Sequence, residues 1–258
     1  MKIRSYWFSK DKNFGDLITP LILKHYGFEP VNCPIENSDV LVVGSILQDL
    51  RRPFAGVVLG SGLIWDASVD LSSSTVLCLR GHLTKACARI KGDTILADPG
   101  LLLAKILPKR TLAKKYVLGL VPHYVDKSHP GIQLLLNRYR DDILLIDVQA
   151  EPHEVVEQVR QCSYILSSSL HGLIVADSLG IPSKWMLLSQ KVIGGGFKFR
   201  DYFSSFNEER VPLQLRGSER LSDLITSYKP QLGAIIEKQE QLDACFKRLS
   251  FVVSETPV

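Results

Sequence analysis

The segment 167–172 places three serine hydroxyls and a histidine directly after a short apolar run. We interpret the run 164–166 as a buried strand and residues 170–179 as the helix that follows it. Serine hydroxyls and the free N–H groups of a helix N-terminus suit a phosphate or a carboxylate. His171 at this position can serve as a general acid near neutral pH, although a capping or core histidine is the ordinary alternative. The residues that we expect to contact the anion are Ser168, Ser169 and Leu170.

Two other segments carry cations that suit an anionic ligand. Arg80 ends an apolar run directly before Gly81, where a guanidinium can bind a phosphate or carboxylate through two hydrogen bonds. Residues 194–202 begin with three glycines and then alternate aromatic and charged side chains, including Lys198 and Arg200. This composition predicts a mobile loop that closes over an anion. A surface ion pair for Arg80 and a flexible basic connector for the loop are the structural alternatives.

Turn-forming and polar residues also follow several other apolar runs, where ligands bind in open parallel sheets. These segments are Asn13-Phe14-Gly15-Asp16, Gly44-Ser45, Gly60-Ser61-Gly62, Asp98-Pro99-Gly100 and Pro122-His123. Asp16 can cap a helix over residues 17–26. The five cysteines form no CxxC pair and the histidines lack metal-ligand spacing, so we expect no disulfide framework and no catalytic metal.

The composition of the 258 residues is that of a globular protein, with 45% hydrophobic and 22% charged residues. This balance argues against disorder and against a coiled coil. The net charge of +4 is too small to indicate nucleic acid by itself, but it suits an anionic ligand. No apolar run reaches the roughly 18 residues that span a bilayer, and the first residues lack a secretory apolar core. We therefore expect a cytoplasmic protein.

Strand-like runs alternate with helical patterns along the chain, which predicts an α/β fold with parallel sheets. The basic stretch 108–115 interrupts the alternation, and we interpret it as a linker between domains 1–112 and 113–258. Two facing Rossmann-like domains with an active-site cleft between them fit this pattern. The amphipathic tail, residues 232–249, can pack back on the first domain. The expected strands are 3–8, 41–43, 57–59, 76–79, 94–96, 116–121, 143–146, 164–166 and 185–188, and the expected helices include 83–90, 132–139 and 154–162.

The ordered set of these motifs resembles the polysaccharide pyruvyl transferases over about residues 1–203. The segments that carry the resemblance are Asn13-Phe14-Gly15-Asp16 with Thr19-Pro20, Gly60-Ser61-Gly62, Arg80-Gly81 with Thr84, Asp98-Pro99-Gly100, Ser168-Ser169-Leu170-His171-Gly172 and Phe197-Lys198-Phe199-Arg200-Asp201-Tyr202. The resemblance implies a GT-B-like fold. It also implies transfer of the enolpyruvyl group of phosphoenolpyruvate (PEP) to a sugar, with release of phosphate and formation of a pyruvate ketal.

The same resemblance implies roles for single residues. His171 matches the family's general acid, Arg80 matches an arginine that holds the donor, and Asp16 matches an acidic residue at the active site. Some members have an arginine where this chain has Ser169. Either another cation then faces the donor, with Lys198 and Arg200 as the candidates, or the serines and the backbone bind it. The acceptor-side candidates are Asn13, Gly60, Ser61 and Gly62.

The expected partners are PEP, as a substrate without further cofactor, and a glycan or lipid-linked oligosaccharide acceptor. Nucleic acid is not expected, and a lipid-linked acceptor would bring the enzyme to the inner membrane face through peripheral contact at most. A glycosyltransferase that uses a nucleotide sugar in the same fold is the enzymatic alternative. A non-catalytic anion-binding module of this fold is the alternative from another class.

Overall fold

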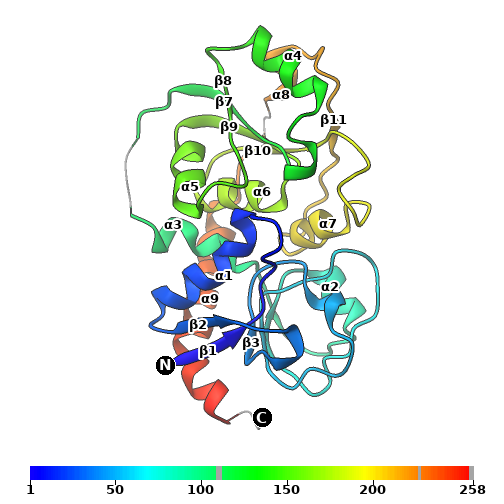
Figure 1. Ribbon diagram of the computed structural model, residues 1–258, viewed down its shortest axis with the longest axis vertical. Helices are drawn as coiled ribbons and strands as arrows, with labels where there is room; N and C mark the ends of the chain where they lie inside the picture. The colour runs from blue at the N-terminus through cyan, green and yellow to red at the C-terminus, as the bar shows by residue number, and fades with distance from the viewer. Residues whose placement is uncertain (109–111, 226–227, 256–258) are drawn as a thin grey trace.

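The structure is a computed structural model that describes residues 1–108, 112–225 and 228–255, and it contains two parallel β-sheets (Figure 1). The first sheet has the strand order β2-β1-β3-β4-β5-β6, and its neighbouring strands all run parallel. Its strands are β1 (Lys2–Ser5), β2 (Glu29–Asn32), β3 (Val40–Leu41), β4 (Val57–Leu59), β5 (Thr75–Leu79) and β6 (Ile95–Leu96).

The second sheet has the order β11-β10-β9-β7-β8, and its neighbours are again parallel. Its strands are β7 (Tyr116–Val121), β8 (Ile143–Leu145), β9 (Cys162–Ser167), β10 (Ser183–Leu187) and β11 (Leu213–Gln214). The predicted α/β class with parallel sheets is therefore confirmed. The prediction succeeds because buried parallel strands are short apolar runs, and the helices between them have a different period.

Helices connect the strands and cover the sheets. They are α1 (Phe14–His25), α2 (His82–Cys87), α3 (Leu103–Ile106), α4 (Pro130–Arg138), α5 (Pro152–Arg160), α6 (Leu170–Ser178), α7 (Phe197–Ser204), α8 (Leu221–Leu224) and α9 (Leu232–Glu255). Short 3₁₀ turns η1 to η4 lie at Ile35–Asn37, Leu47–Asp49, Pro99–Leu102 and Tyr124–Asp126. Every residue of α6 is buried, as is typical of a helix that is enclosed on all sides.

The structure corrects two expectations about local structure. Asn13, not Asp16, is the N-cap of α1, and its side-chain oxygen accepts a hydrogen bond from the Gly15 N–H at 3.1 Å. Asp16 lies in the first turn of the helix. Residues 194–202 do not form one loop, because the buried Phe197 and Phe199 anchor the second half of the segment as helix α7. The three glycines before it all have positive φ, which glycine adopts without strain.

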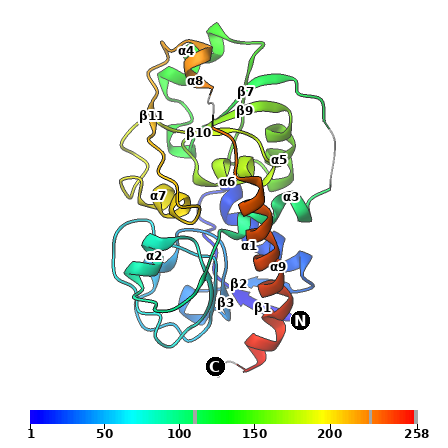
Figure 2. The same ribbon diagram turned by 180° about the vertical axis from the view of Figure 1, so that it is seen from behind.

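Helix α9 is the last helix in the sequence, yet it packs against the first sheet (Figure 2). The Lys238 Nζ donates to the Leu96 carbonyl at 2.6 Å, and the Gln239 Nε2 donates to the Leu101 carbonyl at 2.8 Å. The two sheets come from residues 2–96 and 116–214. The predicted boundary at 112/113 stays a prediction, and 109–111 of the predicted linker lie outside the described residues. Within the described part of the chain, no helix is long and apolar enough to cross a bilayer.

Candidate active site

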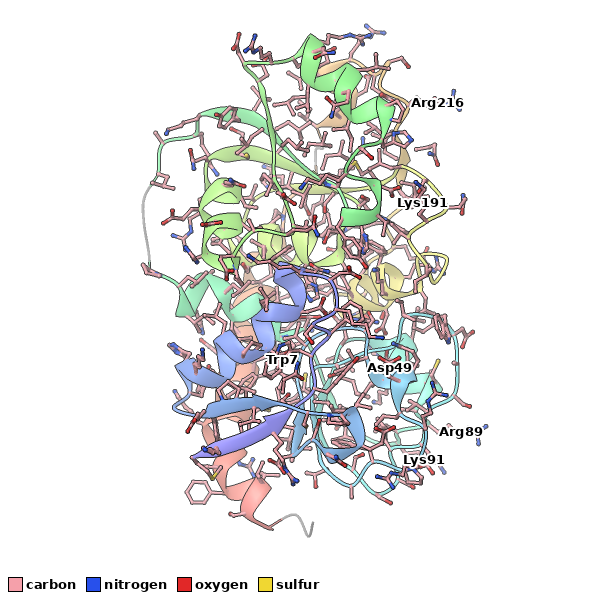
Figure 3. All side chains as sticks on the ribbon, in the orientation of Figure 1. Trp7, Asp49, Arg89, Lys91, Lys191 and Arg216 are labelled. Carbon is pink, nitrogen blue, oxygen red and sulfur yellow. The ribbon has the colours of Figure 1, made fainter. Side chains whose placement is uncertain are left out.

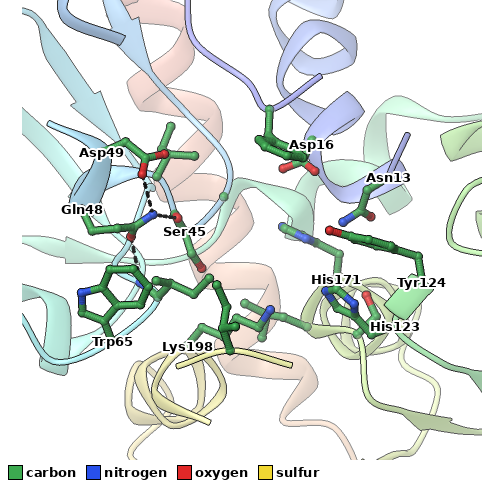
Figure 4. Close-up of a pocket in the computed structure, with 17 residues that line it drawn as sticks. Asn13, Asp16, Ser45, Gln48, Asp49, Trp65, His123, Tyr124, His171 and Lys198 are labelled. Atoms are coloured by element: carbon green, nitrogen blue, oxygen red, sulfur yellow. Dashed lines mark hydrogen bonds between the residues drawn. The ribbon is translucent and has the colours of Figure 1, made fainter. Parts of the chain in front are cut away.

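A cavity of about 270 Å³ lies between the two halves of the chain and is lined by residues from both (Figure 4). The first half contributes the start of α1 and the loops after β3 and β4. The second half contributes the loop after β7 and the N-terminal ends of α6 and α7. The labelled residues around it are Asn13, Asp16, Ser45, Gln48, Asp49, Trp65, His123, Tyr124, His171 and Lys198.

His171 enters this cavity from the first turn of α6, directly beyond strand β9. Its side chain is 8% exposed, and its ring meets the edge of Phe14 with centroids 6.2 Å apart. The ring packs on the backbone of Gly15, where a Cβ atom would overlap it. Its Nε2 is buried and has no hydrogen-bond partner among the described residues. A buried polar atom without a partner is rare in folded proteins and is often associated with a functional role.

Electrostatics keep His171 neutral in the protein without ligand. Burial, as the largest cause, and the nearby charges of Lys198 and Arg80 together lower the pKa of His171 to about 3. The N-terminus of α6 also disfavours an imidazolium. A bound anion acts in the opposite direction, because a negative charge beside the ring favours its protonated form. The proton that His171 would donate is therefore taken up together with an anionic ligand.

Lys198 is the cation that faces the same cavity. It lies in the first turn of α7, is 9% exposed, and makes no ion pair with any carboxylate of the described residues. Its Nζ lies 5.6 Å from the centre of the Phe199 ring. Burial and the charge of Arg80 lower the pKa of Lys198 to about 8, against the opposing effect of Asp16. Lys191, a few residues earlier, points away from the molecule (Figure 3).

Asp16 and His123 are two further titratable groups at this wall, which also includes Asp49 and Tyr124. Burial raises the pKa of the Asp16 carboxyl to about 7, although the charge of Lys198 favours the ionised form. Burial lowers the pKa of His123 to about 4, and Lys198 adds to that effect. A carboxyl group with a pKa near 7 can gain or lose a proton at neutral pH, which a general base requires.

The three serines before His171 have different environments. The Ser167 hydroxyl donates to the Val121 carbonyl at 3.0 Å and accepts from the Ser169 N–H at 3.0 Å. The Ser168 hydroxyl accepts from the His123 N–H at 2.9 Å. Only Ser169 and the neighbouring Leu170 reach the cavity wall, so the first two hydroxyls hold the turn together.

Arg80 does not reach the wall of this cavity. It is fully buried, and its Nε donates to the Asp201 carboxylate at 2.8 Å. Its Nη1 donates to the Ser45 hydroxyl at 2.6 Å, and its Nη2 donates to the Leu63 carbonyl. The guanidinium therefore lies behind Ser45 as an internal ion pair. A direct contact between Arg80 and a donor stays a prediction, and it requires these bonds to rearrange.

Four other predicted residues also lie away from this wall. The Ser61 hydroxyl donates to the Val42 carbonyl at 3.1 Å, and Gly60 and Gly62 pack against Pro99 and Arg80. Arg200 is exposed on the other side of α7, where it lines a second cavity of about 640 Å³. Its Nη1 donates to the Gly195 carbonyl at 2.9 Å. Of the two cations proposed to replace the arginine missing at position 169, the structure brings only Lys198 to the cavity.

Several wall residues were not among the predicted site residues. Ser45 and His123 stand in strand-end segments that the sequence pattern indicated, but neither was chosen as a site residue. Gln48, Trp65 and Tyr124 stand in loops without such a signal, and only the tertiary structure brings them to the cavity.

Comparisons with known proteins match most of the chain. The family model described as polysaccharide pyruvyl transferase matches residues 2–190. An uncharacterized protein of Acanthamoeba polyphaga mimivirus is 32% identical over 221 residues, which cover 81% of this chain and 76% of the relative. The succinoglycan biosynthesis protein ExoV of Rhizobium meliloti is 27% identical over 224 residues, which cover 82% of this chain and 68% of the relative.

Proposed function

The chain belongs to the polysaccharide pyruvyl transferase family, and we propose that it transfers the enolpyruvyl group of PEP to a sugar, with release of phosphate and formation of a pyruvate ketal. The observation that carries the proposal is one small cavity lined by His171, whose buried Nε2 has no partner among the described residues, by the buried Lys198 and by Asp16, whose carboxyl has a raised pKa. These groups supply an acid, an anion-binding cation and a base. The proposed fold is GT-B-like, and the donor site is proposed to lie on the side of the second sheet.

The donor fits the charge of the cavity. PEP carries a phosphate and a carboxylate, and Lys198 offers an ammonium that makes no ion pair within the described part of the chain. The N-terminus of α6 adds backbone N–H groups, and the Ser169 hydroxyl adds one more donor. Because position 169 carries serine, Lys198 provides the positive charge that an arginine supplies in some members of the family.

His171 acts as the general acid in this proposal. It gives its proton to the methylene carbon of PEP, which leaves a cationic centre at C2 that a sugar hydroxyl attacks. A second hydroxyl of the same sugar displaces phosphate and closes the ketal. Burial lowers the pKa of His171 to about 3 in the unliganded protein, so the donor's own negative charge must raise it before the reaction. His171 is therefore protonated, and able to act as an acid, only when the donor is bound.

Asp16 acts as the base toward the acceptor. Burial raises the pKa of this carboxyl to about 7, which suits removal of a proton from a hydroxyl near neutral pH. Asn13 stands beside it at the wall, together with the aromatic rings of Trp65 and Tyr124, which can contact a sugar. Gly60, Ser61 and Gly62 lie behind the wall, so Asn13 is the acceptor-side candidate that we retain. The acceptor class is a polysaccharide unit or its lipid-linked precursor, in line with the name of the Rhizobium relative.

Phosphate release tests the proposal directly. The protein is incubated with PEP and a pool of bacterial cell-surface glycans, and inorganic phosphate and acid-labile pyruvate are measured. We expect release of both that depends on protein and glycan together. A thermal shift with PEP supports the donor, because a ligand that binds the folded state raises the midpoint. Stabilisation by a nucleotide sugar and not by PEP would overturn the proposal in favour of a glycosyltransferase.

A further inference from the structure

A buried carboxylate joins helix α7 to the first half of the chain. Asp201 is fully buried and accepts hydrogen bonds from the Arg80 Nε at 2.8 Å and from the Thr84 N–H at 2.8 Å. The Thr84 hydroxyl also donates to it at 2.7 Å. We call Arg80, Thr84 and Asp201 the Asp201 junction. Three donors from the strand end and helix that follow β5 thus converge on one side chain of α7.

The backbones approach closely at the same place. A Cβ atom at Gly81 would overlap the main chain of Asp201, so only glycine allows this approach. The His82 N–H donates to the Ser204 hydroxyl at 2.9 Å, one turn further along α7. Helix α7 is therefore held against residues 80–84 at two successive turns, although more than 100 residues separate the two segments in the chain.

The junction lies next to the lysine of the cavity. Lys198 and Asp201 stand three residues apart in α7, and such residues are neighbours on a helix surface. Arg80 also reaches the cavity wall indirectly, because its Nη1 donates to the hydroxyl of the wall residue Ser45. Any rotation of α7 about its axis would move Asp201 away from its donors and turn Lys198 away from the cavity.

We propose that Asp201 is a positioning residue, which the Arg80 and Thr84 donors hold so that α7 presents the Lys198 ammonium to the cavity. The inference rests on the proposed function in one respect, namely that Lys198 receives the anionic donor. Thr84 does not line the cavity. Its hydroxyl donates to Asp201 and accepts from the Leu63 N–H at 3.1 Å, so it influences a bound donor through these contacts and not directly. Removal of a charge-assisted hydrogen bond at a buried carboxylate loosens the position of the helix that carries it.

A pair of substitutions at Thr84 tests the junction. Thr84→Val removes the hydroxyl that bonds Asp201 and keeps the shape, whereas Thr84→Ser keeps the hydroxyl. The PEP dissociation constant is measured by calorimetry, and the rate of Lys198 acetylation by acetic anhydride is measured by mass spectrometry without PEP. For Thr84→Val we expect the dissociation constant to rise about tenfold and acetylation of Lys198 to accelerate several-fold. Thr84→Ser should restore both values to those of the parent protein.

Tyr202→Phe is the matched control on the same helix. It removes a hydroxyl that donates to the buried Asp177 at 3.0 Å, away from the junction. We expect it to lower the thermal midpoint without changing PEP affinity or the acetylation rate. Parent-like affinity and labelling in Thr84→Val would overturn the inference, as would equal changes in Tyr202→Phe. If the parent protein binds no PEP, the proposed function fails, and the labelling experiment still decides whether the junction positions Lys198.

Discussion

The segments after β5 and after β9 have similar sequence patterns, but their polar side chains differ in whether they have hydrogen-bond partners. Each follows a buried strand, opens a helix and carries one residue suited to an anion, Arg80 in the first and His171 in the second. The donor nitrogens of Arg80 that bond Asp201, Ser45 and Leu63 all face protein groups. The His171 Nε2 is buried and has no partner in the described part of the chain, and His171 is part of the cavity wall. The comparison shows that the partners of a polar atom, more than its place after a strand, separate an internal ion pair from an unpartnered group at a cavity wall.

The largest expected effect is on turnover by His171→Gln. Glutamine keeps a polar side chain at the site but cannot donate an acidic proton, so turnover should fall by about 10²–10⁴-fold. PEP affinity should change much less, because Lys198 and the N-terminus of α6 remain. Phosphate release under saturating PEP measures the effect, with His25→Gln on the exposed end of α1 as the control. Turnover near the parent rate would exclude His171 as the acid.

Arg80→Met should act mainly on stability. It leaves the Asp201 carboxylate buried without its cation, which lowers the free energy of unfolding by about 3–5 kcal/mol. Arg4→Met is the matched control, because the Arg4–Asp39 pair lies at the surface with the arginine 46% exposed, and such a pair contributes only about 0–1 kcal/mol. Urea denaturation measures both. An Arg80→Met protein of parent stability with weakened PEP binding would make Arg80 a direct donor contact instead.

Lys198→Met should weaken PEP binding by about one to two decades. The substitution removes the cation of the cavity wall, and a charged hydrogen bond contributes about 1.5–3 kcal/mol. Lys191→Met removes an exposed lysine of the same segment and should leave binding unchanged. Isothermal calorimetry with PEP compares the two variants. Equal PEP affinities in the two variants would show that Lys198 does not bind the donor.

Asp16→Asn should change how stability depends on pH. Burial raises the pKa of the folded-state carboxyl to about 7, above its ordinary value of 3.8, so the folded protein binds the proton more tightly than the unfolded chain. The stability that this group contributes is complete below the unfolded pKa and is lost as pH rises through about 7. Between pH 5 and pH 8, Asp16→Asn should therefore gain about 1–2 kcal/mol relative to the parent, after allowance for partial exposure. Urea titrations at both pH values measure this difference, and a constant offset between the proteins would contradict it.

The sequence alone determined the α/β class and most strands, and it singled out His171, which the structure places at the cavity wall. Strand β7 has the predicted bounds, because a buried parallel strand is a short apolar run that ends where the pattern of side chains changes. His171 was found because the sequence itself joins strand β9, the serines and the helix start. Helix α7 was taken for a loop because its three preceding glycines dominate the local signal, whereas its helix depends on the burial of Phe197 and Phe199.

Only the tertiary structure decided which cations face the cavity and which form internal ion pairs or lie elsewhere. Lys198 and Arg200 stand two residues apart in one motif, yet they lie on opposite sides of α7 and line different cavities. Arg80 and Asp201 form their ion pair across 121 positions of the chain, and no local pattern indicates such a partner. The physical reason is that periodicity reports which side chains share a face, whereas hydrogen bonding and burial depend on what the fold places opposite that face.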